Sequence, residues 1–110
     1  MSRKTGDVLE KYVEDSIKYA GLALRKTSNS GAKHNDNDIM TRDFLFECKR
    51  QLSTKHAKLK ADEWAKLAAH AQNLGRLPIM VIEDSEGNKF AVMDFDQLMS
   101  QLAVDPEYDQ

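Results

Sequence analysis

Apolar residues recur every three or four positions in three segments of the chain, which is the spacing of an amphipathic helix. These segments cover about residues 6–20, 61–74 and 95–102. A glycine follows each of the first two, and Asp94 can cap the third. On the first helix, Glu10 lies only about 20° beyond the edge of the apolar side, so we expect its carboxylate at the rim of the helix contact.

Strand-like segments lie between these helices. They cover about residues 22–27, 38–41, 44–51 and 78–93, the last as a hairpin around the turn DSEGN. Alternation along the third segment puts Glu47 and Lys49 on one face of the strand and Phe44, Phe46 and Cys48 on the other. Because a helix separates strands along the chain, the sequence predicts an α/β fold with helices packed on a mixed sheet.

The length of 110 residues suits one domain with a single core and is too short for two ordinary domains. We therefore expect one domain over residues 1–110, with about 104–110 as a frayed acidic tail. No apolar run is long enough to cross a bilayer, and the N-terminus lacks the apolar stretch of a signal peptide. The sequence thus predicts a cytoplasmic protein without membrane contact.

Charge is distributed unevenly, although the net charge is only −2. Residues 25–60 contain nine lysines and arginines against four acidic residues, whereas residues 61–110 contain three against ten. A local positive excess suits a polyanionic partner such as DNA, although a solvated charged face is the alternative. The basic residues that we expect to contact a nucleic-acid backbone are Arg25, Lys33, His34, Arg50 and Lys55.

Two carboxylates and one amine lie in segments that the core needs for burial, where a lone charge is costly. If the strand that begins at Asp38 pairs with the strand that carries Glu47, the two carboxylates can converge on Mg²⁺, with the backbone carbonyl of Cys48 as a third ligand. Lys49 shares the face of Glu47 and can orient or help deprotonate a metal-bound water. This set could hydrolyse a phosphodiester; the alternative is a surface Glu–Lys pair of little energetic value.

Other reactive side chains have simpler interpretations. Cys48 is the only cysteine, so it cannot form an internal disulfide, and we expect its thiol to be buried and unused. Trp64 belongs to the apolar side of the second helix and is interpreted as a core or dimer contact. His70 is expected on an exposed side of the same helix.

Four stretches, in the order GDVLE, SGAKH, DI and FLFECK, resemble the PD(D/E)xK nucleases, and among them the small Holliday-junction resolvases of archaea and phages. The resemblance implies a restriction-endonuclease-like mixed five-stranded sheet flanked by helices. It also implies an endonuclease that needs Mg²⁺, which Mn²⁺ can replace, and that acts as a homodimer in DNA recombination and repair. Such an enzyme makes paired nicks across a four-way DNA junction.

Carried over to this chain, the resemblance makes Asp38 and Glu47 metal ligands and Lys49 the catalytic lysine. Glu10 would be a helix-borne carboxylate that reaches the site through metal or water, and Ser30 would assist near the scissile phosphate. Three other functions stay open. These are a nuclease of the same fold for linear duplex, flaps or single strands, a non-catalytic nucleic-acid-binding module, and an interaction protein that works through its acidic half.

Overall fold

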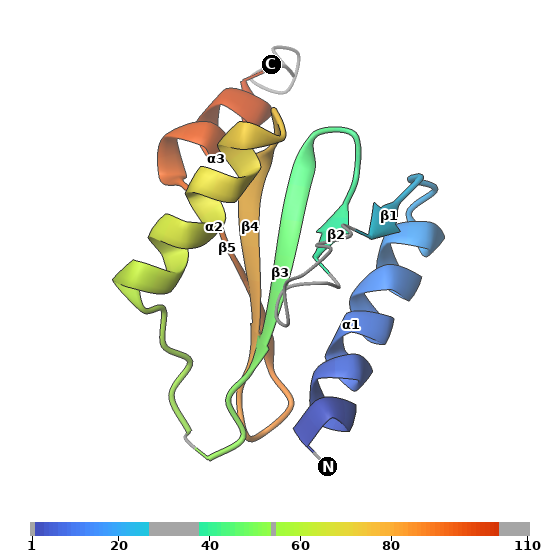
Figure 1. Cartoon of the computed structure of the whole chain (residues 1–110), viewed down its shortest axis with the longest axis vertical. Coiled ribbons are helices and arrows are strands. Elements are labelled where there is room, and N and C mark those ends of the chain that lie inside the picture. The colour runs from blue at the N-terminus through green and yellow to red at the C-terminus, as the bar shows by residue number, and fades with distance from the viewer. Residues whose placement is uncertain (1, 27–37, 54, 104–110) are drawn as a thin grey trace, which may run out of the picture.

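The computed structural model describes residues 2–26, 38–53 and 55–103. Its elements are α1 (Ser2–Tyr19), β1 (Arg25–Lys26), β2 (Ile39–Met40), β3 (Phe44–Arg50), α2 (Ala61–Asn73), β4 (Leu77–Glu83), β5 (Lys89–Val92) and α3 (Phe95–Leu102) (Figure 1). The five strands form one sheet in the order β1-β2-β3-β4-β5. Strands β3 and β4 pair in parallel, and the remaining three neighbouring pairs are antiparallel. This confirms the predicted α/β class and the mixed five-stranded sheet.

Helices α1 and α2 lie on opposite sides of the sheet (Figure 1). The core on the α1 side contains Leu9, Val13, Ile17 and Ile39, with Phe46, Cys48 and Val81 packed against it. The core on the α2 side contains Met40, Leu45, Leu67, Ala71, Met80 and Ile82, with Trp64 packed against it. The predicted alternation along β3 is therefore confirmed, and Trp64 is a core residue as expected.

The N-terminal strands are shorter than predicted. Of the expected strand 22–27, residues 22–26 are described, and among these only Arg25 and Lys26 pair with β2, because the chain leaves α1 through a turn in which Gly21 has φ +85°. Strand β2 ends at Met40, since Thr41 closes a tight turn into β3. Its N–H donates to the Phe44 carbonyl at 2.9 Å, and its hydroxyl accepts from the Phe44 N–H at 3.2 Å.

A glycine turn fixes the end of α2. Gly75 has φ +71°, its N–H donates to the Gln72 carbonyl at 3.1 Å, and the Arg76 N–H donates to the Ala71 carbonyl at 2.8 Å. This is a Schellman motif, which satisfies carbonyls that the helix leaves without a partner. The Arg76 side chain then donates to the Thr41 carbonyl at 3.0 Å, so the end of α2 is tied to the β2–β3 turn.

Helix α3 begins as the sequence predicts, with the Asp94 side chain accepting a hydrogen bond from the Gln97 N–H at 3.1 Å. None of its residues is buried. Phe95 is 68% exposed and Leu102 is 60% exposed, although both belong to its apolar side. The structure thus leaves an apolar helix face in contact with solvent.

Candidate active site

Strand pairing sets Asp38 opposite Glu47. In the β2–β3 register, Ile39 pairs with Phe46 and Met40 with Leu45, so the next position places Asp38 across from Glu47. Directly opposite residues of an antiparallel pair point to the same face, with Cβ atoms about 5 Å apart. That face is the one covered by α2, because Met40 and Leu45 belong to the α2-side core. The structure brings the two carboxylates together, as the sequence interpretation required.

The Asp38 carboxyl group is buried in unfavourable surroundings for its charge. The residue is only 5% exposed. Burial raises the pKa of Asp38 to about 7, and the negative charges of Glu47 and Glu10 add to the increase, while Lys49 opposes it. A buried carboxylate beside two others is a group whose ionised form a bound cation would stabilise.

Lys49 extends from β3 on the same face as Glu47. Its Nζ lies 3.2 Å from Glu47 Oε2 and 3.8 Å from Glu63 Oε2 of α2. The side chain is 35% exposed, so the ammonium group is in contact with solvent while it is held between two carboxylates. An amine in this position can donate to a phosphate oxygen or to a water beside the carboxylates.

Helix α2 adds a residue that the sequence interpretation missed. His70 does not lie on an exposed side of the helix, as expected, but is 31% exposed with its Nδ1 3.5 Å from Asp38 Oδ2. The reason is its place on the helix, about 60° from the fully buried Leu67 and next to the buried Ala71. Glu63 lies seven residues earlier, on the same side within about 20°. This seven-residue spacing along the flank of the apolar stripe is the signal that could have identified both residues.

Glu10 influences the site from the other helix. Its residue is half-buried, as expected for a rim position, and its charge raises the pKa of both Asp38 and Cys48. Burial is the main cause that raises the pKa of the Cys48 thiol to about 12. Because Cys48 faces the α1-side core, its thiol stays protonated and unreactive, in agreement with the sequence interpretation.

The expected metal ligands do not form a complete protein cage. Among the described residues, no three His, Cys, Asp or Glu side chains lie close enough together to hold a metal ion. Magnesium is nevertheless commonly bound by one or two carboxylates and several waters, rather than by protein groups alone. Asp38 and Glu47 supply two such oxygen donors on one face, so the donor set fits a hard, hydrated cation.

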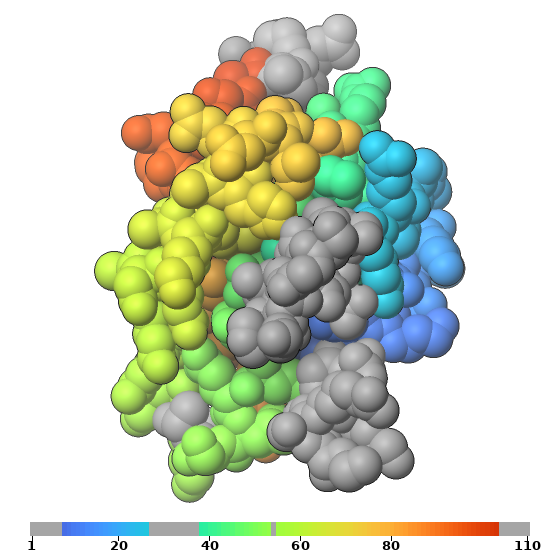
Figure 2. Space-filling model, in the orientation of Figure 1, coloured from blue at the N-terminus to red at the C-terminus, as the bar shows by residue number. Residues whose placement is uncertain are grey.

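The predicted DNA contacts divide into three groups. Lys33 and His34 lie outside the described residues, as does Ser30, which was expected to assist near the scissile phosphate. Lys55 is exposed, and Arg25 is exposed and pairs in register with Met40 on the strand that follows Asp38. The space-filling view shows the connection after β3 (green) at the surface below α2 (yellow-green) (Figure 2).

Arg50 has a different environment from the one expected. Its Nε lies 2.9 Å from Glu83 Oε1, and both side chains are largely buried. Alternation along β3 places Arg50 with Phe46 and Cys48, on the side of the sheet opposite Glu47 and Lys49. Arg50 therefore lies on the other side of the sheet from the candidate site, and the expectation that it contacts DNA there is wrong.

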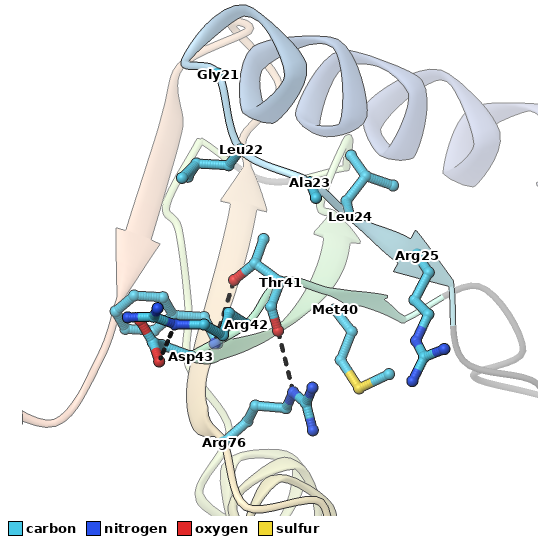
Figure 3. A pocket seen from close by; sticks show the side chains of 11 residues that line it. Gly21, Leu22, Ala23, Leu24, Arg25, Met40, Thr41, Arg42, Asp43 and Arg76 are labelled. Atoms are coloured by element: carbon cyan, nitrogen blue, oxygen red, sulfur yellow. Dashed lines mark hydrogen bonds and ion pairs between the residues drawn. The ribbon is translucent and has the colours of Figure 1, made fainter.

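A pocket of about 660 Å³ opens beside β2 but does not contain Asp38, Glu47 or Lys49. It forms because residues 21–24 diverge from the β2–β3 turn (Figure 3). The pocket is lined by Gly21, Leu22, Ala23, Leu24, Arg25, Met40, Thr41, Arg42, Asp43, Phe44 and Arg76. Two of its arginines already have partners within the chain. Arg42 Nε lies 3.4 Å from Asp43 Oδ1, and the Arg76 side chain donates to the Thr41 and Leu74 carbonyls.

Comparison with known proteins gives no match to a family model, to a curated protein or to a solved structure. The described part of the chain contains no helix that is both long and apolar enough to cross a membrane.

Proposed function

We propose that this chain is a Mg²⁺-dependent endonuclease of the PD(D/E)xK type that cuts branched DNA, with four-way junctions as the preferred substrate. The observation that carries the proposal is the cross-strand placement of Asp38 opposite Glu47, with Lys49 Nζ 3.2 Å from Glu47. A surface Glu–Lys pair alone would not require a second, buried carboxylate, that of Asp38, whose pKa is raised to about 7. Structural ion pairs normally lower the pKa of a carboxyl group instead.

In the proposed reaction, Asp38 and Glu47 would hold the metal through their carboxylate oxygens. When bound, Mg²⁺ would lower the pKa of a coordinated water and offset the charge of the scissile phosphate. Lys49 donates from its ammonium group to a phosphate oxygen or to the attacking water, and Glu47 keeps that group in place. The water loses a proton to solvent as its oxygen forms a bond to phosphorus. The bond from phosphorus to one sugar oxygen breaks, and that oxygen leaves with a proton taken from solvent.

Exposed basic residues would bind the DNA backbone on either side of this site. Arg25 on β1 and Lys55 after β3 are the described candidates. Such contacts position the duplex without reading its sequence. Of the acidic C-terminal half, α2 borders the site through Glu63 and His70, so only the acidic residues beyond α2 would lie away from the phosphates, since like charges repel.

The proposed enzyme acts as a homodimer, because a four-way junction presents pairs of equivalent strands to two equal active sites. We place the contact between copies on α3, whose exposed apolar side carries no charged residue. This side consists of Phe95, Leu98, Met99 and Leu102. The same residues of a second copy could cover it in a two-fold contact. Replacing both Phe95 and Leu102 by aspartate should then convert the dimer into a monomer in analytical sedimentation. If the variant keeps the dimer mass of the wild type, the contact between copies lies elsewhere.

Cleavage of a labelled four-way junction, beside a linear duplex of the same sequence, tests the proposal directly. We expect cutting of the junction with Mg²⁺, none with chelator, none by the Asp38→Asn variant, and strongly reduced cutting by the Lys49→Ala variant. Equal cutting of both substrates would favour a nuclease of the same fold with a broader substrate range. DNA binding without cutting by the wild type would favour a non-catalytic module.

The remaining alternative is an interaction protein that works through its acidic half. That function predicts that neither Mg²⁺ nor Mn²⁺ changes the melting temperature, since a ligand that binds only the folded state must raise it. A melting curve of the wild type with and without Mn²⁺ therefore separates this alternative from any metal-dependent nuclease.

A further inference from the structure

We infer that His70 is a positioning residue, which orients the Asp38 carboxylate so that it can bind the metal of the proposed active site. This inference rests on the proposed function. It assigns a role in the site to α2, a helix from which the sequence resemblance takes no functional residue.

The contact joins two elements that are far apart in the chain. His70 Nδ1 lies 3.5 Å from Asp38 Oδ2, and the Asp38 side chain is 6% exposed. The imidazole is 31% exposed, so one edge of the ring meets solvent while the other faces the carboxylate. Of the three histidines in the sequence, His34 lies outside the described residues and His56 is exposed in the connection before α2.

The backbone of His70 is held firmly enough to fix this contact. Leu67, one turn earlier, is 1% exposed, and Ala71, the next residue, is 0% exposed. Both belong to the α2-side core together with Met40, which lies two residues after Asp38. The Ala71 carbonyl also accepts the Arg76 N–H of the Schellman turn. Helix α2 therefore cannot rotate about its axis without unpacking the core beside Asp38.

A carboxylate that binds a metal needs its orientation fixed. A side chain rotating between conformations would hold the ion in only some of them, and outer contacts to a ligating group normally supply this restraint. A ring nitrogen 3.5 Å from Oδ2 limits the space in which the Asp38 carboxyl group can rotate, and its N–H would donate to Oδ2 after a small closing movement. The negative charges of Glu47 and Glu10 repel the same carboxylate.

Metal binding in the absence of DNA is the direct test, because it does not depend on catalysis. Free Mn²⁺ is measured by electron paramagnetic resonance during titration of the metal-free protein. His70→Ala should weaken Mn²⁺ binding by about 10-fold or more. His70→Asn should recover most of this loss, since its amide nitrogen lies near the position of Nδ1 and can donate to Asp38. Gln72→Ala, on an exposed position of the same helix, should bind Mn²⁺ as the wild type does.

A second measurement needs no metal and uses the melting temperature at about pH 8, where Asp38 is ionised. His70→Ala should lower the melting temperature more when it is introduced into the wild type than when it is introduced into the Asp38→Asn variant. The reason is that His70 stabilises the fold through this contact only when residue 38 carries a negative charge. Cleavage should follow the metal data: a lower kcat at saturating DNA, with KM for DNA unchanged.

The possible results separate the inference from the proposed function. If the wild type binds Mn²⁺ and cuts DNA, but His70→Ala binds Mn²⁺ with unchanged affinity, the role of His70 is wrong and the nuclease stands. If the wild type neither binds Mn²⁺ nor cuts DNA, both are wrong. If His70→Ala does not fold, His70→Gln decides, because its amide nitrogen lies near the position of Nε2 and not of Nδ1. Weaker Mn²⁺ binding by folded His70→Gln supports positioning through Nδ1, and wild-type affinity overturns it.

Discussion

Replacing Asp38 by asparagine should stabilise the folded chain in the absence of metal, although it should abolish cleavage. The ionised carboxylate is the unfavourable form in the folded state, since burial and the neighbouring carboxylates raise the pKa of Asp38 from 3.8 to about 7. Asparagine has nearly the same shape and carries no charge. The substitution therefore removes the unfavourable charge and keeps most of the packing.

The sign and size of the effect follow from the linkage between proton binding and folding. Below the unfolded pKa of 3.8, both states hold the proton and the carboxyl group has no pH-dependent effect. As the pH rises from 3.8 to about 7, the unfolded chain loses the proton first, so the folded state becomes progressively less stable; above about 7 the loss is complete. The difference corresponds to roughly 4 kcal/mol, at about 1.4 kcal/mol per pH unit.

The measured gain should be smaller than this limit. The proton is shared among coupled carboxyl groups, and Asp38→Asn also weakens the contact with His70. We expect about 1 to 3 kcal/mol at about pH 8, which is about 5 to 15 °C in melting temperature for a domain of this size.

Circular dichroism melting in chelator, at about pH 4.5 and about pH 8, measures the gain directly. The wild type should lose stability between these values relative to the variant, and added Mn²⁺ should restore the wild type but not the variant. An Asp38→Asn variant that melts at or below the wild-type temperature at the higher pH would refute the reasoning. The ionised Asp38 carboxylate would then be stabilised by other residues of the folded chain and would not need a bound cation.

Four further outcomes are expected. Lys49→Ala should lower the cleavage rate by about 10² to 10⁴, while junction affinity in a gel-shift assay changes by less than about twofold. The matched control is Lys66→Ala at an exposed position of α2, and equal cleavage rates of the two variants would contradict the role of the Lys49 amine. The affinity for Mn²⁺ should fall by about tenfold per pH unit below about 7, because Asp38 must lose its proton to bind; a flat profile excludes Asp38 as a ligand. Leu45→Ala, at a fully buried position of the central strand, should cost about 2 to 5 kcal/mol in urea unfolding, and a loss below about 1 kcal/mol would mean that this core is loosely packed. Gly75→Ala should cost about 1 kcal/mol because alanine disfavours φ +71°, although its Cβ would meet no other atom.

Local sequence patterns were sufficient for the types of element. The three helices, the β4–β5 hairpin and the two faces of β3 follow from apolar spacing, because helices and strands bury one side at fixed periods. The Asp94 cap and the glycines that end α1 and α2 are equally local, since each satisfies backbone groups within a few residues. The strand bounds were less accurate at β1, where the turn after α1 carries the chain away from β2 before Arg25.

The candidate site shows where local information ends. The sequence by itself determined that Glu47 and Lys49 share a face, because strand residues two apart always do. Whether Asp38 meets them depends on the register of β2 with β3, which only the tertiary structure decided. The same is true of His70 and Glu63, which approach the site because α2 packs across β3 and β4, and of Arg50, which pairs with Glu83 on the opposite side. Contacts between distant segments depend on how whole elements pack, and no short pattern of residues encodes the position of a partner element.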